Sequence, residues 1–180
     1  MQVNYQTKMI KNKKKGILFW MTGLPGAGKT SIANKIIRPI NKKFGHTILF
    51  NGDDIRKIFD LKDYSFVGRK RIGMQYSKLF KTITDQKINV LFAGGVLIEE
   101  VRKRNKKNIN NYVEIYLKCD QKKIISKNLK KLYLKTKNLV GLKIKPEYPK
   151  NPDIIIYNDF KKSIKKLSED LIFKINQKTK

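Results

Sequence analysis

Residues 23–30 have the types and order of a phosphate-binding loop. They read Gly-Leu-Pro-Gly-Ala-Gly-Lys-Thr and match the pattern G-x-x-x-x-G-K-[ST]. Glycines in this pattern let backbone N–H groups curve around a phosphate without Cβ clashes. The lysine, Lys29, is expected to reach the β- and γ-phosphates, and the hydroxyl of Thr30 to bind Mg²⁺. We therefore predict ATP and Mg²⁺ as cofactors, with nucleotide contacts at Gly23, Leu24, Pro25, Gly26, Ala27, Gly28, Lys29, Thr30 and Ser31.

The segments on either side of this loop are those that would hold it in place. Residues 17–22 form an apolar run without polar alternation, which is typical of a strand buried on both faces. After the loop, Ile32, Ile36 and Ile40 are four residues apart and predict a helix from Thr30 to about Lys43. The positive end of that helix would point at the bound phosphate. Gly45 is expected to end the helix in a left-handed conformation.

Strands and helices alternate along the rest of the chain. Further strands are expected at 46–50, 90–93, 112–117 and 153–157, and helices at 55–59, 68–85, 97–107, after Asp120 and along 160–175. This order indicates an α/β, three-layer P-loop NTPase/kinase fold with a parallel sheet of about five strands. Residues 134–150 contain lysine, glycine and proline and are interpreted as a loop or lid. We expect a basic N-terminal lead-in at 1–15 and a single kinase domain at 16–180.

A second group of polar residues follows the second expected strand. Asn51-Gly52-Asp53-Asp54 reads as a turn at the carboxyl end of that strand, where we expect Asp53 to lie beside the P-loop. There, Asp53 can accept the proton of an acceptor hydroxyl while the γ-phosphoryl group is transferred, so Asp53 and Lys29 are the predicted catalytic residues. Arg56 is placed to hold an anionic acceptor. The alternative is that Asp53 or Asp54 only caps the short helix that follows.

Several segments, taken in order, resemble the adenylylsulfate (APS) kinases. The resemblance covers Ile17 to Asn158. Beyond the P-loop, residues 51–56 resemble the D-G-D-x-x-R segment of the family, and Tyr64-Ser65 through Arg69 resemble its G-F-S…D-R segment. Residues 130–133 resemble K-G-L-Y, and residues 140–153 resemble the lid segment with its P-x-x-P-x-x-P ending.

The resemblance implies a reaction and roles for particular residues. ATP would phosphorylate the ribose 3′-hydroxyl of adenylylsulfate, giving ADP and 3′-phosphoadenylylsulfate, as in sulfate assimilation. Asp53 would be the base near that hydroxyl, and Arg56 and Arg69 would hold the phosphosulfate. Tyr64 would replace the phenylalanine that stacks on adenine. Lys130, and lid positions near Val140, would close over the nucleotides, and the protein would be a homodimer.

The chain also departs from the family pattern. Asn51 replaces the first aspartate of D-G-D, Ile72 an asparagine that contacts APS, Val96 a serine, Lys131 the glycine of K-G-L-Y, and Leu139 a lid aromatic. This is the pattern expected when phosphoryl transfer is kept and the acceptor has changed. Residues 72–79, 99–118 and 140–153 also resemble an APS-kinase-like subgroup of polysaccharide-modification pathways, one of whose activities is phosphorylation of cytidine diphosphoramidate. That activity is the main alternative.

The composition bounds the remaining choices. The net charge of +28 raises the alternative of a nucleic-acid-binding P-loop protein, but the lysines are spread along the chain without a nucleic-acid-binding motif. Arg102 and Arg104 either hold phosphates or lie on a solvated helix face. The longest apolar run, residues 17–21, is too short to span a bilayer, so no membrane partner is expected. A single cysteine, Cys119, cannot form an intrachain disulfide, which favours the cytoplasm.

Overall fold

A computed structural model describes residues 15–126, 140–141 and 143–178. Strands and helices alternate along the chain, as the sequence predicts. The elements are β1 (Ile17–Gly23), α1 (Lys29–Phe44), β2 (Thr47–Asn51), α2 (Gly52–Ile58), α3 (Phe66–Asp85), β3 (Asn89–Gly94), α4 (Glu99–Asn108), β4 (Asn111–Lys118), α5 (Gln121–Ser126), β5 (Ile154–Tyr157) and α7 (Ile164–Lys178).

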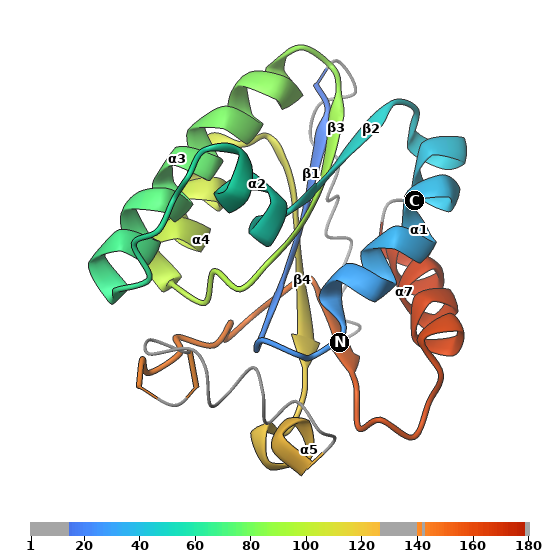
Figure 1. The fold of residues 1–180 in the computed structure, drawn as a ribbon. Coiled ribbons are helices and arrows are strands. Elements are labelled where there is room, and N and C mark those ends of the chain that lie inside the picture. Colours follow the sequence, from blue (N-terminus) through green and yellow to red (C-terminus); the bar gives the residue numbers. More distant parts are fainter. Residues whose placement is uncertain (1–14, 127–139, 142, 179–180) are drawn as a thin grey trace, which may run out of the picture.

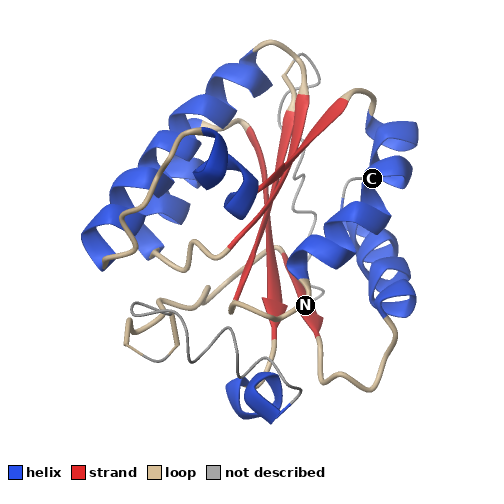
Figure 2. Ribbon diagram, viewed as in Figure 1, coloured by secondary structure: helices blue, strands red, loops and turns tan. Residues whose placement is uncertain are grey.

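The described strands form one five-stranded sheet in the order β2-β3-β1-β4-β5, and every pair is parallel. Helices α1 and α7 cover one face, and α2, α3 and α4 lie on the other (Figures 1 and 2). The predicted three-layer α/β class is therefore confirmed. Strand β3 lies between β1 and β2, so the first two strands of the chain are not neighbours in the sheet. The connection through α1 passes over one strand position, and β3 later fills that position.

The core consists of two apolar clusters, one on each face of the sheet. Every residue of β1 is buried, which explains its unbroken apolar run. Phe19 and Met21 belong to the cluster under α1, together with the predicted helix face of Ile32, Ile36 and Ile40. Trp20 belongs to the opposite cluster, where its ring lies 4.4 Å from that of Phe92 and 6.1 Å from that of Phe80. The P-loop strand is thus held from both faces.

Local capping groups set several element boundaries. Gly45 ends α1 with a φ of 87°, and the Asp120 carboxylate accepts a 2.7 Å hydrogen bond from the backbone N–H of Lys122 at the start of α5. The helix α2 begins at Gly52, so Asp53 lies in a first helical turn and not in the expected turn before the helix. The helix α7 begins at Ile164, and the earlier position Phe160 has a φ of 64°, which a helix does not allow.

Two expected segments fall largely outside the described residues. All of the predicted lead-in except Lys15 does so, as do residues 134–139 and 142 of the predicted lid. The described end of the lid segment contacts α4, because the carboxylate of Glu147 accepts a 2.5 Å hydrogen bond from the N–H of Glu99. Within the described ranges, we find no helix with the length and apolar character needed to cross a membrane.

Candidate active site

The P-loop connects the end of β1 to the start of α1. Gly26 and Gly28 have φ values of 80° and 97°, a backbone region that glycine adopts without strain. The ammonium group of Lys29 donates hydrogen bonds to the carbonyl oxygens of Gly23 at 3.1 Å and Leu24 at 2.8 Å. Burial lowers the pKa of Lys29 to about 8, and the nearby charge of Asp53 acts in the opposite direction.

A residue that sequence reasoning missed connects the P-loop to the far end of the chain. The side chain of Asn158, just beyond β5, donates a 2.9 Å hydrogen bond to the carbonyl oxygen of Ala27 and is 3% exposed. Its own oxygen accepts from the N–H of Phe160. Its position after a strand end is the one signal that would have found it, because carboxyl ends of parallel strands meet at one edge.

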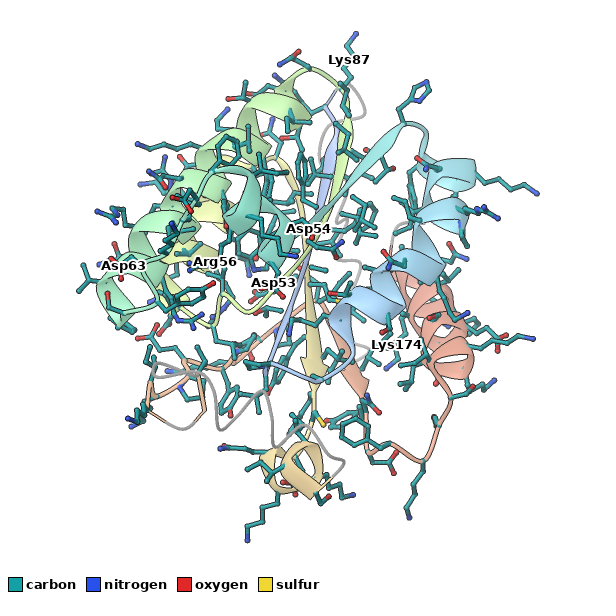
Figure 3. All side chains as sticks on the ribbon, in the orientation of Figure 1. Asp53, Asp54, Arg56, Asp63, Lys87 and Lys174 are labelled. Atoms are coloured by element: carbon teal, nitrogen blue, oxygen red, sulfur yellow. The ribbon has the colours of Figure 1, made fainter. Side chains whose placement is uncertain are left out.

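Asp53 occupies the first turn of α2 without capping it. The N-cap residue is Asn51, whose side-chain amide donates a 3.1 Å hydrogen bond to the carboxylate of Asp54. The charge of Asp53 raises the pKa of Lys29 and also that of Arg69, against the larger lowering effects on each. Asp53 is therefore close to both Lys29 of the P-loop and Arg69 of α3. Figure 3 shows Asp53 and Arg56 on the same side of the molecule, whereas Lys87 lies at the opposite end of the sheet.

Arg56, Tyr64 and Arg69 form a cluster around one aromatic ring. The guanidinium carbon of Arg56 lies 4.4 Å from the ring centroid of Tyr64, and that of Arg69 lies 5.4 Å from it. Burial lowers the pKa of Arg69, and the charge of Arg56 lowers it further. Two guanidinium groups held this close repel each other unless an anion lies between them. The cluster therefore suits a phosphate or sulfate group.

The remaining residues singled out from the sequence lie in different places. Lys130, Lys131 and Leu139 fall outside the described residues. Val140 is buried in the apolar cluster that includes Leu24 and Ala27 of the P-loop. Ile72 is 2% exposed and belongs to the cluster around Trp20.

The position of Arg102 contradicts both interpretations proposed for it, phosphate binding and a solvated helix face. Its Nε atom lies 2.8 Å from a carboxylate oxygen of Glu114, and the two side chains are 6% and 11% exposed. It is therefore neither a phosphate ligand at the surface nor part of a solvated face. The carboxylate of Glu114, on β4, is buried with it, which the sequence pattern of the helix alone does not reveal.

The residues near the P-loop fit a magnesium ion that arrives with a nucleotide. The parts of the chain described contain no cluster of three His, Cys, Asp or Glu side chains that would hold a metal by themselves. Thr30 is exposed at the start of α1, and the buried side-chain oxygen of Asn51 accepts no hydrogen bond from any described residue. Mg²⁺ commonly takes few protein ligands and completes its shell with water and substrate phosphates, so these oxygens are compatible with it.

A parallel sheet in this strand order, with a P-loop after β1 and a carboxylate and two arginines near its carboxyl edge, defines a P-loop kinase. The adenylylsulphate kinase family matches residues 15–157 of the sequence. The chain belongs to that family and is a phosphotransferase that acts on an alcohol group.

Individual relatives support the same assignment. The chain is 30% identical over 168 residues to a cytidine diphosphoramidate kinase of Campylobacter jejuni, covering 91% of this chain and 98% of the relative. It is 29% identical over 154 residues to an adenylyl-sulfate kinase of Thermodesulfovibrio yellowstonii, covering 81% of this chain and 76% of the relative. The fold is similar to that of a Mycobacterium tuberculosis APS kinase in complex with AMPPNP and APS, with a TM-score of 0.78, 23% identity, and coverage of 90% and 98% of the two chains.

Proposed function

We propose that this protein transfers the γ-phosphoryl group of ATP to a ribose 3′-hydroxyl of a nucleotide that carries a second acidic group. The observation that supports this most directly is the position of Asp53, whose charge acts on the pKa of both Lys29 and Arg69. A carboxylate between a γ-phosphate site and an anion site is placed to accept the proton of the attacking hydroxyl.

Each neighbouring group has a defined task in this proposal. The P-loop amides and Lys29 bind the β- and γ-phosphates and stabilise the charge that develops during transfer. Mg²⁺, when bound with ATP, would neutralise phosphate charge, with Thr30 as its protein ligand. Arg56 and Arg69 hold the acidic group of the acceptor, and Tyr64 contacts its nucleoside. Lys130, which precedes the lid segment, and Val140, which lies within it, are proposed to contribute to acceptor binding.

Two acceptors fit this scheme, and each is favoured by a specific observation. Adenylylsulfate is the substrate implied by the family to which the chain belongs. Cytidine diphosphoramidate is favoured by the relative that this chain matches over 98% of its length. Ile72 counts against the first acceptor, because an apolar side chain buried in the core cannot make the hydrogen bond that the family's asparagine at this position would make to adenylylsulfate.

The proposal is tested by ADP release from ATP and Mg²⁺, with adenylylsulfate, cytidine diphosphoramidate and related nucleotide diphosphates offered in turn. Saturable turnover with one of these is expected, and the acceptor with the highest kcat/KM identifies the substrate. No turnover with any of them, while ATP still binds, would refute the proposal.

The variant Asp53→Asn tests the role of the carboxylate. We expect kcat to fall by about 10²–10⁴-fold, the range usual for removing a general base, because the amide cannot take the hydroxyl proton. Binding of a non-hydrolysable ATP analogue, measured by calorimetry, should be retained. An Asp53→Asn enzyme with unchanged kcat would show that the proton leaves by another route.

A further inference from the structure

The acceptor arginines depend on a short segment between α2 and α3. Arg56 does not stand free, since its Nη1 atom donates to the carbonyl oxygens of Leu61 at 2.8 Å and Asp63 at 3.2 Å. From the other side, the Nε atom of Arg69 donates to the carbonyl oxygen of Tyr64 at 3.0 Å. The position of both guanidinium groups is therefore set by the backbone of residues 61–64.

That backbone is attached to α3 by an incomplete capping box. In a complete box, the N-cap serine accepts from the N–H of the third helical residue, and an acidic side chain of that residue accepts from the N–H of the serine. Ser65 makes the first bond, since its hydroxyl accepts from the N–H of Gly68 at 3.0 Å. The third residue is a glycine and has no side chain for the second bond.

Asp63 supplies the missing bond from outside the helix. Its Oδ1 atom accepts from the N–H of Ser65 at 3.0 Å and from the hydroxyl of Ser65 at 2.7 Å, and its Oδ2 atom lies 3.5 Å from Arg71. The two bonds from Ser65 are the largest causes that lower the pKa of the Asp63 carboxyl. A Cβ on Gly68 would lie 2.0 Å from the carboxyl carbon of Asp63, so this carboxylate occupies the space of a residue-68 side chain.

We propose that Asp63 is a positioning residue of the acceptor site, because it replaces the acidic half of the capping box at the start of α3 and thereby holds Tyr64 and Arg69 against Arg56. This role rests on the proposed function, in which these three residues bind the acceptor. In the APS kinase pattern G-F-S…D-R, a glycine precedes the aromatic residue and an aspartate precedes the arginine. In this chain the two residue types are exchanged, with Asp63 before Tyr64 and Gly68 before Arg69.

The reversed order makes an exchange experiment possible. Asp63→Ala should raise the KM for the acceptor about tenfold, the loss expected when one charge-assisted hydrogen bond is removed, and leave the KM for ATP within about twofold. Asp63→Asn should raise the acceptor KM by less than Asp63→Ala does, because the amide oxygen of the asparagine still accepts a hydrogen bond from Ser65. Gly68→Asp alone should raise the acceptor KM because of the 2.0 Å clash. The double variant Asp63→Gly/Gly68→Asp should restore the acceptor KM to near that of the unaltered enzyme.

Two further measurements separate this inference from loss of folding and from failure of the proposed function. Amide hydrogen exchange of Ser65 and Gly68 in the protein without substrate should be faster in Asp63→Ala, with an unchanged melting temperature. Asp60→Asn is the matched control, since Asp60 precedes the same segment and its carboxylate forms an exposed pair with Lys62 at 2.9 Å.

Unchanged amide exchange in Asp63→Ala, or faster exchange with an unchanged acceptor KM, would overturn the inference. Equal increases in the KM for ATP and for the acceptor would also overturn it, as would a double variant no better than Asp63→Ala. An unaltered enzyme that phosphorylates none of the nucleotides would instead refute the proposed function. Amide hydrogen exchange would then still decide whether Asp63 holds residues 61–65 in place.

Discussion

The ammonium group of Lys29 lies among the carbonyl oxygens of its own loop, where burial disfavours its charge. That burial lowers the pKa of Lys29 to about 8, although Asp53 partly offsets the shift. Only the protonated lysine attracts the phosphates of ATP, and a bound triphosphate would raise its pKa again. Because the pKa of Lys29 in the free enzyme is about 8, the protonated fraction of this lysine, and with it the binding of ATP, depends on pH in the range used for assays.

The pH profile of nucleotide capture tests this argument. We expect kcat/KM for ATP to fall by about tenfold per pH unit above the pKa of the free enzyme, here about 8, as Lys29 loses its proton. Lys29→Arg should weaken the reaction but remove this alkaline limb, because a guanidinium stays protonated. A profile of the unaltered enzyme that remains flat to about pH 9.5 would show that the lysine keeps its ordinary pKa.

The pair of Arg102 and Glu114 shows what a buried charge requires. Burial raises the pKa of Glu114 to about 7, and the charge of Arg102 acts against that increase. Removing Arg102 leaves the buried carboxyl of Glu114 either charged without its partner or forced to take up a proton, which is more unfavourable than losing an exposed pair.

Arg102→Met is therefore expected to lower the free energy of unfolding by about 3–5 kcal/mol, the usual effect of breaking a buried ion pair. Denaturant unfolding measures this change. Lys103→Met, on the same helix and exposed, is the matched control and should leave the unfolding midpoint unchanged. Equal effects of the two substitutions would show that the Arg102 side chain is hydrated in solution.

At the scale of elements, α3 and α4 approach closely at one glycine. A Cβ on Gly73 would lie 2.9 Å from a methyl group of Val101, on α4, and 3.0 Å from one of Val96, in the loop before α4. Both valines are branched at Cβ and have little freedom to move aside. The same loop lies at the edge of the P-loop strand, since the hydroxyl of Thr22 donates to the carbonyl oxygen of Val96 at 3.1 Å. Packing between these helices therefore bears on the position of the active-site edge.

Gly73→Val is expected to destabilise the protein by about 1–3 kcal/mol, because the larger side chain overpacks the interface between α3 and α4. Thermal and denaturant unfolding give the measurement. Glycine has a lower helix propensity than valine, so propensity alone would make Gly73→Val neutral or slightly stabilising, whereas Gln75→Val, on the exposed side of α3, measures what valine loses by propensity at an uncrowded position. A Gly73→Val variant as stable as the unaltered protein would show that the interface between α3 and α4 accommodates the larger side chain.

At the scale of the whole molecule, the net charge of +28 creates a field that attracts every anion. ATP and the proposed acceptors are all anionic, so the field favours their capture without a specific contact. Nucleic acid is attracted by the same field, which is why charge alone does not distinguish a kinase from a nucleic-acid-binding protein.

Salt dependence separates a general electrostatic effect from a specific one. Raising NaCl from about 50 to about 500 mM should lower kcat/KM for nucleotides by about 3- to 10-fold through screening, with kcat little changed. Sucrose of equal osmolality is the control. Single-stranded RNA should inhibit at low salt without stimulating ATP hydrolysis, and strong stimulation would favour the nucleic-acid alternative.

The sequence by itself determined the features that depend on neighbouring residues. The P-loop pattern, the buried first strand, the four-residue spacing along α1 and the cap at Asp120 all follow from local rules of backbone conformation and side-chain periodicity. Together with the alternation of strands and helices, these were enough to predict the α/β class, the parallel sheet and the place of Asp53 at its carboxyl edge.

Only the tertiary structure decided which distant residues meet. The strand order places β3 between β1 and β2, which the sequence of no single strand reveals. The contacts of Asn158 with Ala27, of Arg102 with Glu114 and of Arg56 with Tyr64 likewise join separate elements. Periodicity states which face of an element is buried, but it does not state what that face will contact.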